Sequence, residues 1–176
     1  MEELQELIKG CAANNMLSQE KLYRKFYPAL FLLCKKFIAD DRDALETLND
    51  GMLKVYKNIA KYNFEKGDFF NWVYTIIRNT VLDKLKITKL PVSQELMTGI
   101  KEDDALSPLK KLEWKDIYIL LDSLTPGTRA VCSLFYLEGF SVNDISECLK
   151  ISAGTVKWHL SETRRKLKPV MEKYYT

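Results

Sequence analysis

The chain has 176 residues, of which 47% are hydrophobic and 29% are charged, with only seven glycines and five prolines. This composition favours helices with hydrophobic cores, and the length suits one large domain or two small ones. The net charge is only +3, so any affinity for a polyanion must come from local patches rather than from the chain as a whole.

The cysteine and histidine content argues against a metal site or a disulfide framework. Four cysteines are scattered without a CxxC pair, and His159 is the only histidine. We expect Cys11, Cys34, Cys132 and Cys148 to be small buried hydrophobes in a reducing cytosol. The first residues lack the basic start and apolar run of a signal peptide, and no stretch reaches the ~18 apolar residues of a membrane span. We therefore expect a soluble, cytoplasmic protein with no metal and no cofactor.

Helical periodicity predicts two helices before residue 40. The first covers residues 2–14. The second begins with Ser18 as its cap and runs to about Ala39, and Pro28 inside it predicts a kink or a turn.

A third helix is predicted from Asp43 to Ile59, and the beginning of its outer face is acidic. Residues 40–50 hold five acids and one base, whereas residues 21–36 hold five bases and no acid. Acids near a helix N-terminus suit the helix dipole, so a solvated face explains this pattern. A docking surface for a basic partner explains it equally well. The side chains concerned are Asp43, Glu46, Asn49 and Asp50.

Residues 62–68 are predicted to form a loop with a turn at Lys66 and Gly67, after which Asp68 caps a helix from Phe69 to about Ile87. Large aromatic residues alternate with bases in this helix. Such a pattern suits stacking on unpaired nucleotides. An ordinary core has the same spacing and is the commoner case. The residues concerned are Trp72, Tyr74, Arg78, Asn79, Lys84 and Lys86.

The chain changes character after residue 88. Residues 88–107 lose helical periodicity, contain a proline and a glycine and include an acidic run, so we expect a linker and a domain boundary here. Beyond it, Ser107 and Pro108 open a helix, and a further helix begins at Thr125 and is ended by Gly139.

Residues 141–167 have the pattern of two short helices with a tight turn. Ser141 and Asp144 have the spacing of a capping box, and Ser152 can cap the second helix. Residues 152–173 hold six Lys or Arg against two Glu. A basic helix presented by a supporting helix is the layout of a helix-turn-helix, although ordinary helical corners share the periodicity. The expected inner face is Val156, Leu160, Thr163 and Leu167.

In this order the motifs resemble those of the extracytoplasmic-function (ECF, group IV) sigma factors of bacterial RNA polymerase, which belong to the sigma-70 family. The stretches that carry the resemblance are LYRKFYPALF, DALETLNDGMLKVYKNI and FNWVYTIIRNTVLDKL, then LTPGTRAVCSLFYLEGFSVNDISECLKISAGTVKWHLSETRRKL after the linker. The resemblance implies an all-α fold of two helical domains joined by a flexible linker. These are a sigma2-like domain at residues 1–88, an acidic linker at 89–107 and a sigma4-like helix-turn-helix domain at 108–176.

The resemblance also implies a function: binding core RNA polymerase at its clamp and flap and directing promoter-specific transcription initiation, without catalysis and without a small-molecule substrate. An anti-sigma factor is a further expected partner, and the active protein is expected at the nucleoid. The residues implied to dock on the polymerase are Asp43, Glu46, Asn49 and Asp50. Those implied to recognise and melt the minus-ten element are Tyr62, Phe69, Trp72, Arg78, Asn79 and Asp83. Those implied to read the minus-thirty-five element are Ser152, Thr155, Lys157, Trp158, Ser161, Glu162, Arg164 and Arg165.

Several residues depart from the family pattern. Trp158 and His159 stand where Ser-Arg is common, and Glu162 stands where a base-reading Arg is common. Glu accepts a hydrogen bond from cytosine but repels phosphate. The promoter sequences that family members recognise therefore do not predict the sequence that this chain recognises. Asn49 stands where Gln is usual, and Gly51 weakens its helix by ~1 kcal/mol relative to Ala.

Two other classes of function explain these motifs less completely. A stand-alone helix-turn-helix transcriptional regulator explains the C-terminal half but leaves the acidic helix and residues 62–87 unexplained. An enzyme is not indicated, because the sequence has no glycine-rich phosphate loop, no metal-ligand cluster and no nucleophile paired with a base.

Overall fold

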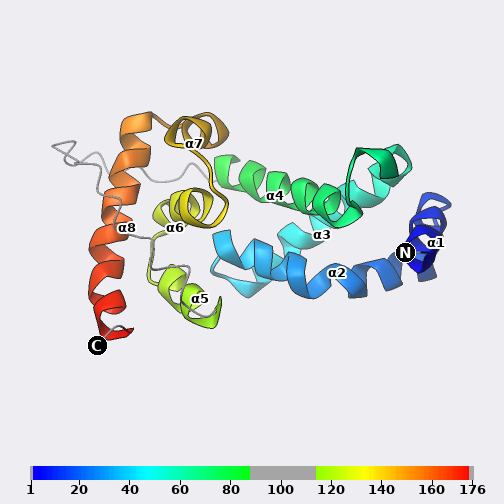
Figure 1. Ribbon diagram of the computed structural model, residues 1–176, viewed down its shortest axis with the longest axis horizontal. Coiled ribbons are helices and arrows are strands. Elements are labelled where there is room, and N and C mark those ends of the chain that lie inside the picture. Colours follow the sequence, from blue (N-terminus) through cyan, green and yellow to red (C-terminus); the bar gives the residue numbers. More distant parts are fainter. Residues whose placement is uncertain (1, 88–113, 175–176) are drawn as a thin grey trace. The chain divides into compact units, whose positions relative to one another are not determined.

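The computed structural model describes residues 2–87 and 114–174, and every regular element within these ranges is a helix (Figure 1). The all-α prediction is confirmed for this part of the chain. The predicted linker at residues 89–107 and the helix start predicted at Ser107 lie outside the described residues. The domain limits therefore stay a prediction.

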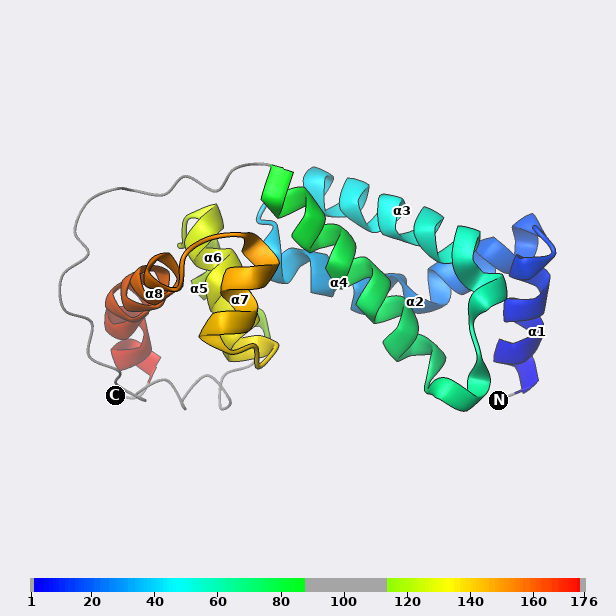
Figure 2. The same cartoon turned by 90° about the horizontal axis from the view of Figure 1, so that it is seen from above.

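The chain divides into two compact units, which we call the N-terminal and C-terminal units. The first comprises Met1–Lys35 with Asp40–Lys84, and the second comprises Lys36–Ala39 with Leu85–Thr176. In the N-terminal unit α2, α3 and α4 run alongside one another, and α1 lies against the first turns of α2 (Figures 1 and 2). The elements are α1 (Glu2–Ala12), α2 (Met16–Phe37), α3 (Asp41–Asn58), the 3-10 turns η1 (Ile59–Lys61) and η2 (Phe64–Lys66), and α4 (Phe69–Ile87).

The second helix begins earlier than predicted and is capped by Asn15. Oδ1 of Asn15 accepts a hydrogen bond from the Ser18 backbone N–H at 2.9 Å, so the prediction of Ser18 as the cap is wrong. Ser18 instead packs against Gly10 of α1, where an added Cβ would collide with its side chain. Both residue types are good caps, and the local pattern alone cannot show that α1 packs on this turn. The helix continues through Pro28 to Phe37, so Pro28 does not mark a turn.

A close approach between α3 and α4 depends on Gly51. An added Cβ at this position would stand 2.5 Å from Cδ1 of Ile77. Ile77 is itself fully buried, so its methyl group has no open space to move into. Gly51 therefore permits this close approach, and a side chain at this position would have to displace the end of Ile77. The fully buried core of these helices includes Leu22, Ala44, Leu48, Val55, Val73, Ile77 and Val81.

In the C-terminal unit α8 packs on both α6 and α7, and one core cluster joins α5, α6 and α8 through Leu121, Cys132 and Leu167. The single helix predicted to start at Thr125 is divided: after α6 the chain widens into a π-helical turn, in which the Glu138 N–H donates to the Ser133 carbonyl at 3.0 Å. The elements are α5 (Trp114–Asp122), α6 (Pro126–Cys132), the π turn η4 (Ser133–Leu137), α7 (Val142–Leu149) and α8 (Ala153–Tyr174).

The predicted helix-turn-helix is formed by α7 and α8. Ser141 Oγ accepts a hydrogen bond from the Asp144 N–H at 3.2 Å, and Asp144 Oδ2 accepts one from the Ser141 N–H at 3.0 Å, which completes the capping box. Lys150 ends α7 in the left-handed conformation, with φ of 55°. Ser152 Oγ then accepts a hydrogen bond from the Thr155 N–H at 3.0 Å and caps α8. The predicted inner face is buried throughout: Val156, Leu160, Thr163 and Leu167.

Candidate functional site

The outer face of α8 carries the side chains predicted to read duplex DNA. Its inner face is held by the core, so the residues between the buried positions point away from α6 and α7. Lys157 and Arg165 are exposed, and Trp158 and Ser161 are half-buried. All eight predicted residues escape full burial and are available at the surface: Ser152, Thr155, Lys157, Trp158, Ser161, Glu162, Arg164 and Arg165.

Glu162 and Arg165 are paired on this face. Arg165 donates from Nε to Oε2 of Glu162 at 2.8 Å and from Nη2 to Oε1 at 2.7 Å. These hydrogen bonds lower the pKa of the Glu162 carboxyl below its ordinary value, so the group remains an anion near neutral pH. Lys166 lies farther away, with its Nζ 3.8 Å from Oε1 of Glu162.

His159 lies beneath the outer face and belongs to the core. Its side chain is 1% exposed, its Nδ1 lies 3.1 Å from Oγ1 of Thr128 on α6, and its ring meets Trp158 edge to face. Burial lowers the pKa of His159 below its ordinary value. Nε2 is buried without a hydrogen-bond partner in the described part of the chain. The sequence identified this residue only as a departure from the family motif.

In the N-terminal unit an aromatic cluster surrounds the loop before α4. The ring centroid of Tyr62 lies 4.9 Å from that of Phe69 and 5.5 Å from that of Trp72. Phe69 is only 2% exposed, so its ring supports the other two and is not open to a ligand. Phe64 of η2 contacts Tyr62 with centroids 4.8 Å apart and is 47% exposed. Sequence reasoning did not single out Phe64, because loop residues carry no periodic signal.

Three polar contacts order this loop. The Tyr62 hydroxyl donates to the Gly67 carbonyl at 2.7 Å. Oδ1 of Asn63 accepts from the Glu65 N–H at 2.8 Å. Oδ1 of Asp68 accepts from the Asn71 N–H at 3.2 Å, which confirms the predicted cap of α4. The loop is therefore a folded platform beside the aromatic rings.

Helical geometry separates the polar residues predicted on α4. Trp72, Asn79 and Asp83 are seven and four residues apart, so they fall on one line along the helix, whereas Arg78 lies roughly a third of a turn away. Asn79 and Asp83 are exposed, and Lys54 of α3 places its Nζ 3.9 Å from Oδ2 of Asp83. Trp72, Asn79 and Asp83 therefore share one line of α4, spread along about three turns, whereas Arg78 lies on another side.

The acidic face of α3 is exposed at all four predicted positions, Asp43, Glu46, Asn49 and Asp50. Glu46 is 3.3 Å from Nζ of Lys84, and Oδ1 of Asn49 accepts from the Tyr23 hydroxyl at 2.8 Å. Leu53 lies one turn beyond Asn49 on the same face and is 56% exposed. Its spacing gave no sign of this role, and it adds an exposed apolar side chain at the C-terminal end of the acidic face.

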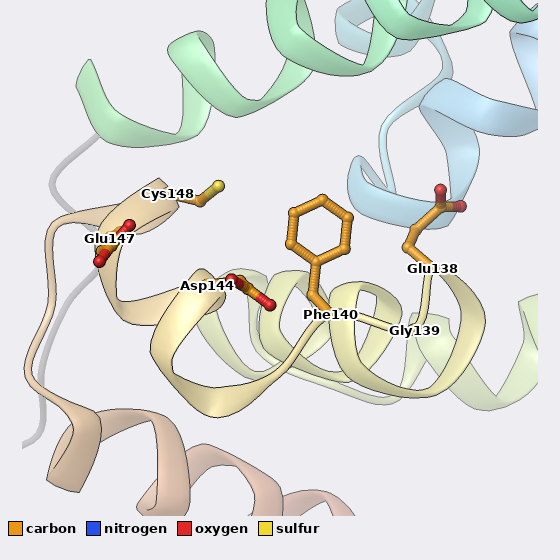
Figure 3. A pocket seen from close by; sticks show the side chains of 6 residues that line it. All are labelled: Glu138, Gly139, Phe140, Asp144, Glu147 and Cys148. Carbon is orange, nitrogen blue, oxygen red and sulfur yellow. The ribbon is translucent and has the colours of Figure 1, made fainter.

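An open hollow of about 400 Å³ lies at the start of α7 (Figure 3). Three of its lining residues are acidic, and Asp144 already closes the capping box. Carboxylates repel phosphate, so this hollow is unsuited to nucleic acid. Its lining residues are Glu138, Gly139, Phe140, Asp144, Glu147 and Cys148.

The described residues hold no group of three or more His, Cys, Asp or Glu side chains arranged for a metal ion. The cysteines carry free thiols; Cys11, Cys34 and Cys132 are buried as predicted, whereas Cys148 is half-buried. No helix within residues 2–87 or 114–174 combines the length and apolar character needed to cross a bilayer.

Two family descriptions match the chain. Sigma-70 region 2 matches residues 22–89, and Sigma-70, region 4 matches residues 120–169, so together they cover more than half of it. The first therefore contains α3, the aromatic loop and α4. The second contains the helix-turn-helix.

The chain is also similar to curated ECF RNA polymerase sigma factors. It is 23% identical to SigE of Mycolicibacterium smegmatis over 165 residues, which cover 90% of this chain and 63% of SigE. It is 24% identical to SigW of Bacillus subtilis over 154 residues, which cover 79% of this chain and 81% of SigW. The chain thus spans less than two thirds of the length of SigE.

Two solved structures of complexes are similar to the chain. The sigma factor RpoE in complex with the anti-sigma factor NepR from Bartonella quintana has a TM-score of 0.48 at 19% identity, covering 87% of this chain and 96% of RpoE. CnrH in complex with the cytosolic domain of CnrY has a TM-score of 0.46 at 18% identity, covering 95% of this chain and 96% of CnrH. Because region 2 and region 4 follow one another here and the sequence relatives are ECF sigma factors along most of this chain, the chain belongs to the ECF group of the sigma-70 family.

Proposed function

We propose that this chain binds core RNA polymerase, directs it to specific promoters and catalyses no reaction itself. The observation that carries the proposal is the presence of three chemically different exposed faces in one chain. These are the acidic face of α3, the aromatic and polar face at the start of α4, and the basic outer face of α8.

The outer face of α8 suits the duplex minus-thirty-five element. Lys157 and Arg165 are exposed cations that can donate to guanine or to phosphate, and Ser161 adds a less selective donor and acceptor. Phosphate contacts set the position of such a helix, whereas contacts with base edges set the sequence that it reads. Ser152 and Thr155, at the N-terminal end of α8, would contact the phosphates that flank the groove.

The aromatic cluster beside the loop before α4 suits the melted minus-ten element. Trp72 and Tyr62 are half-buried and support one another, so their rings are held in place before any base arrives. Stacking of a base on such a ring contributes ~1–3 kcal/mol. Asn79 lies on the same line of α4 as Trp72 and offers the donor and acceptor needed to read the pairing edge of a flipped base. Phe69 acts by supporting these rings.

The acidic face of α3 suits a basic protein surface, which we assign to the polymerase clamp. Asp50 and Leu53 are both exposed and lie about one turn apart, and an exposed leucine next to a carboxylate favours a protein partner over bulk solvent. The same carboxylates repel DNA, so this face and the outer face of α8 cannot exchange partners. We further propose that the C-terminal unit contacts the polymerase flap. An anti-sigma factor is the remaining proposed partner. Their surfaces on this chain are not assigned to particular residues.

A reconstitution experiment tests the proposal. Core RNA polymerase of the source bacterium is incubated with the purified chain and sheared genomic DNA, and the 5′ ends of new transcripts are mapped. We expect transcripts that start at defined sites only when the chain is present. Asp50→Arg should abolish co-purification with the core enzyme, whereas Glu3→Lys, an exposed charge reversal on α1, should leave it intact. The absence of co-purification, or of transcripts that depend on the chain, would refute the proposal.

A stand-alone regulator is not favoured. Such a protein needs only a helix-turn-helix, whereas the Sigma-70 region 2 match covers α3 and α4 as well.

A further inference from the structure

The pair formed by Glu162 and Arg165 leaves one edge of the arginine for a ligand. The guanidinium group has five N–H donors. Glu162 occupies Nε and one N–H of Nη2, through hydrogen bonds of 2.8 Å and 2.7 Å. Glu162 does not use the two N–H groups of Nη1 or the second N–H of Nη2. These groups lie on the side of the planar guanidinium away from Glu162, and we call this side the outer edge of Arg165.

The two partners differ in exposure. The Glu162 side chain is 19% exposed, whereas the Arg165 side chain is 70% exposed. The carboxylate is therefore set back against the helix, and the guanidinium extends from it toward solvent. The residues are three apart and lie on the outer face of α8, opposite the buried Leu160 and Leu167.

The outer edge of Arg165 matches a guanine. In the major groove guanine presents two acceptors, O6 and N7, and the commonest specific contact is a bidentate one from arginine. A guanidinium held by a carboxylate has fewer rotamers to lose when it binds. Each carboxylate oxygen already accepts a hydrogen bond from Arg165, so a cytosine could reach Glu162 only by sharing these oxygens with the arginine.

We propose that Glu162 is a positioning residue that holds Arg165 so that the outer guanidinium edge reads one guanine in the duplex. This inference rests on the proposed function, because it assumes that α8 enters a major groove. Glu162 is then a determinant of specificity that makes no base contact of its own. It also weakens binding to every sequence alike, because its negative charge faces the phosphates.

The test uses the full chain assembled with core polymerase on duplexes randomised across the minus-thirty-five region. Bound sequences are counted, and affinity for one unrelated duplex is measured in parallel. For the unmodified chain we expect one G·C pair to be preferred about 5- to 150-fold over the other pairs. Arg165→Ala should lose this preference. Arg165→Lys should lose it too, because lysine keeps the charge without the fork.

Glu162→Gln gives the decisive result. It should reduce the preference several-fold at the same base pair and should raise affinity for the unrelated duplex. In the Arg165→Ala background it should not change the preference further. Lys168→Ala, which removes an exposed cation elsewhere on α8, should weaken binding to all sequences alike. Thermal unfolding of each variant separates these effects from loss of fold, since a purely structural role would shift the melting temperature and not the base preference.

Three results would overturn the inference. Glu162→Gln could change the preference at a base pair that Arg165 does not control, which would make the carboxylate a base reader. It could leave the Arg165-dependent preference intact. Arg165→Ala could leave every preference intact. By contrast, a failure of the unmodified chain with core polymerase to enrich any sequence would refute the proposed function itself.

Discussion

Replacing Gly51 with alanine should destabilise the N-terminal unit, although alanine is the better helix former. Removing a glycine from a helix interior stabilises it by ~1 kcal/mol. The new methyl group, however, would stand 2.5 Å from Cδ1 of Ile77, which is fully buried. Overpacking of this kind costs ~1–3 kcal/mol. The difference predicts a net loss of about 1 kcal/mol in the free energy of unfolding, taking the middle of that range.

A second substitution makes this reasoning specific to the contact. Ile77→Val removes the methyl group that the new Cβ would strike, and alone it should cost ~0.5–1.5 kcal/mol. In the double variant the added methyl group occupies the vacated space. The double variant should therefore be at least as stable as Ile77→Val, which corresponds to a coupling of at least about 1 kcal/mol between the two sites, rising to about 2 kcal/mol if the whole overpacking cost is removed.

Urea unfolding of the full chain, followed by circular dichroism and tryptophan fluorescence, gives the four stabilities of this cycle. Leu53→Ala, on the exposed face of the same helix, is the control and should change stability by less than about 0.5 kcal/mol. Two results would refute the reasoning: a single Gly51→Ala variant more stable than the unmodified chain, or effects of Gly51 and Ile77 that add within experimental error.

Three further predictions concern the C-terminal unit and the division of labour between the units. Burial lowers the folded-state pKa of His159 below the ordinary value of 6.5, so the neutral, buried ring supports the fold fully above pH 6.5. Below pH 6.5 the unfolded chain takes up the proton more readily, and the free energy of unfolding falls by at most about 1.4 kcal/mol per pH unit. Urea unfolding between pH 7.5 and about 5 should show this slope, and His159→Leu should remove it. Lys150→Gly should raise the free energy of unfolding by about 0.5–1 kcal/mol, because φ of 55° strains a residue with a Cβ; an unchanged or lower urea midpoint would contradict this. Trp72→Ala should impair strand opening, measured by permanganate reactivity of promoter thymines, more than duplex binding, whereas Lys157→Ala should do the reverse; equal defects in both assays would count against separate readers.

The helix-turn-helix could be predicted from sequence because its signals are local. A capping box at Ser141 and Asp144, a cap at Ser152 and a periodic inner face each depend on residues within one or two turns of one another. The cap of α4 at Asp68 was predicted for the same reason. The capping box and the two caps each close a hydrogen bond at the start of their own helix, and the inner face follows the helical period, so no knowledge of the tertiary fold is needed.

The features that sequence reasoning missed depend on contacts between helices. Ser18 looked like a cap because nothing local shows that α1 packs against it. Gly51 looked like a weak point because the methyl group of Ile77 is 26 residues away along the chain. Helical spacing allowed Phe69 a place in the core, whereas the resemblance implied that it reads the minus-ten element. Only the rings of Tyr62 and Trp72 packed around it show that it is buried. Residue type and spacing indicate candidate side chains for a site, but packing decides which of them are exposed to a ligand.

The charge distribution explains why such a chain would act with a larger partner rather than alone. Affinity for DNA grows with the number of phosphates that a protein neutralises. Here the net charge is only +3, and one exposed arginine of the reading helix is held by Glu162. The acidic face of α3 repels DNA while offering contacts to a basic protein surface. If that face tethers the chain to core polymerase, each DNA-reading unit meets its element at a high effective concentration, and the weak intrinsic affinity of α8 becomes sufficient. A reader that is weak by itself and strong when tethered gives promoter recognition that depends on the polymerase, which is the behaviour that the proposed function requires.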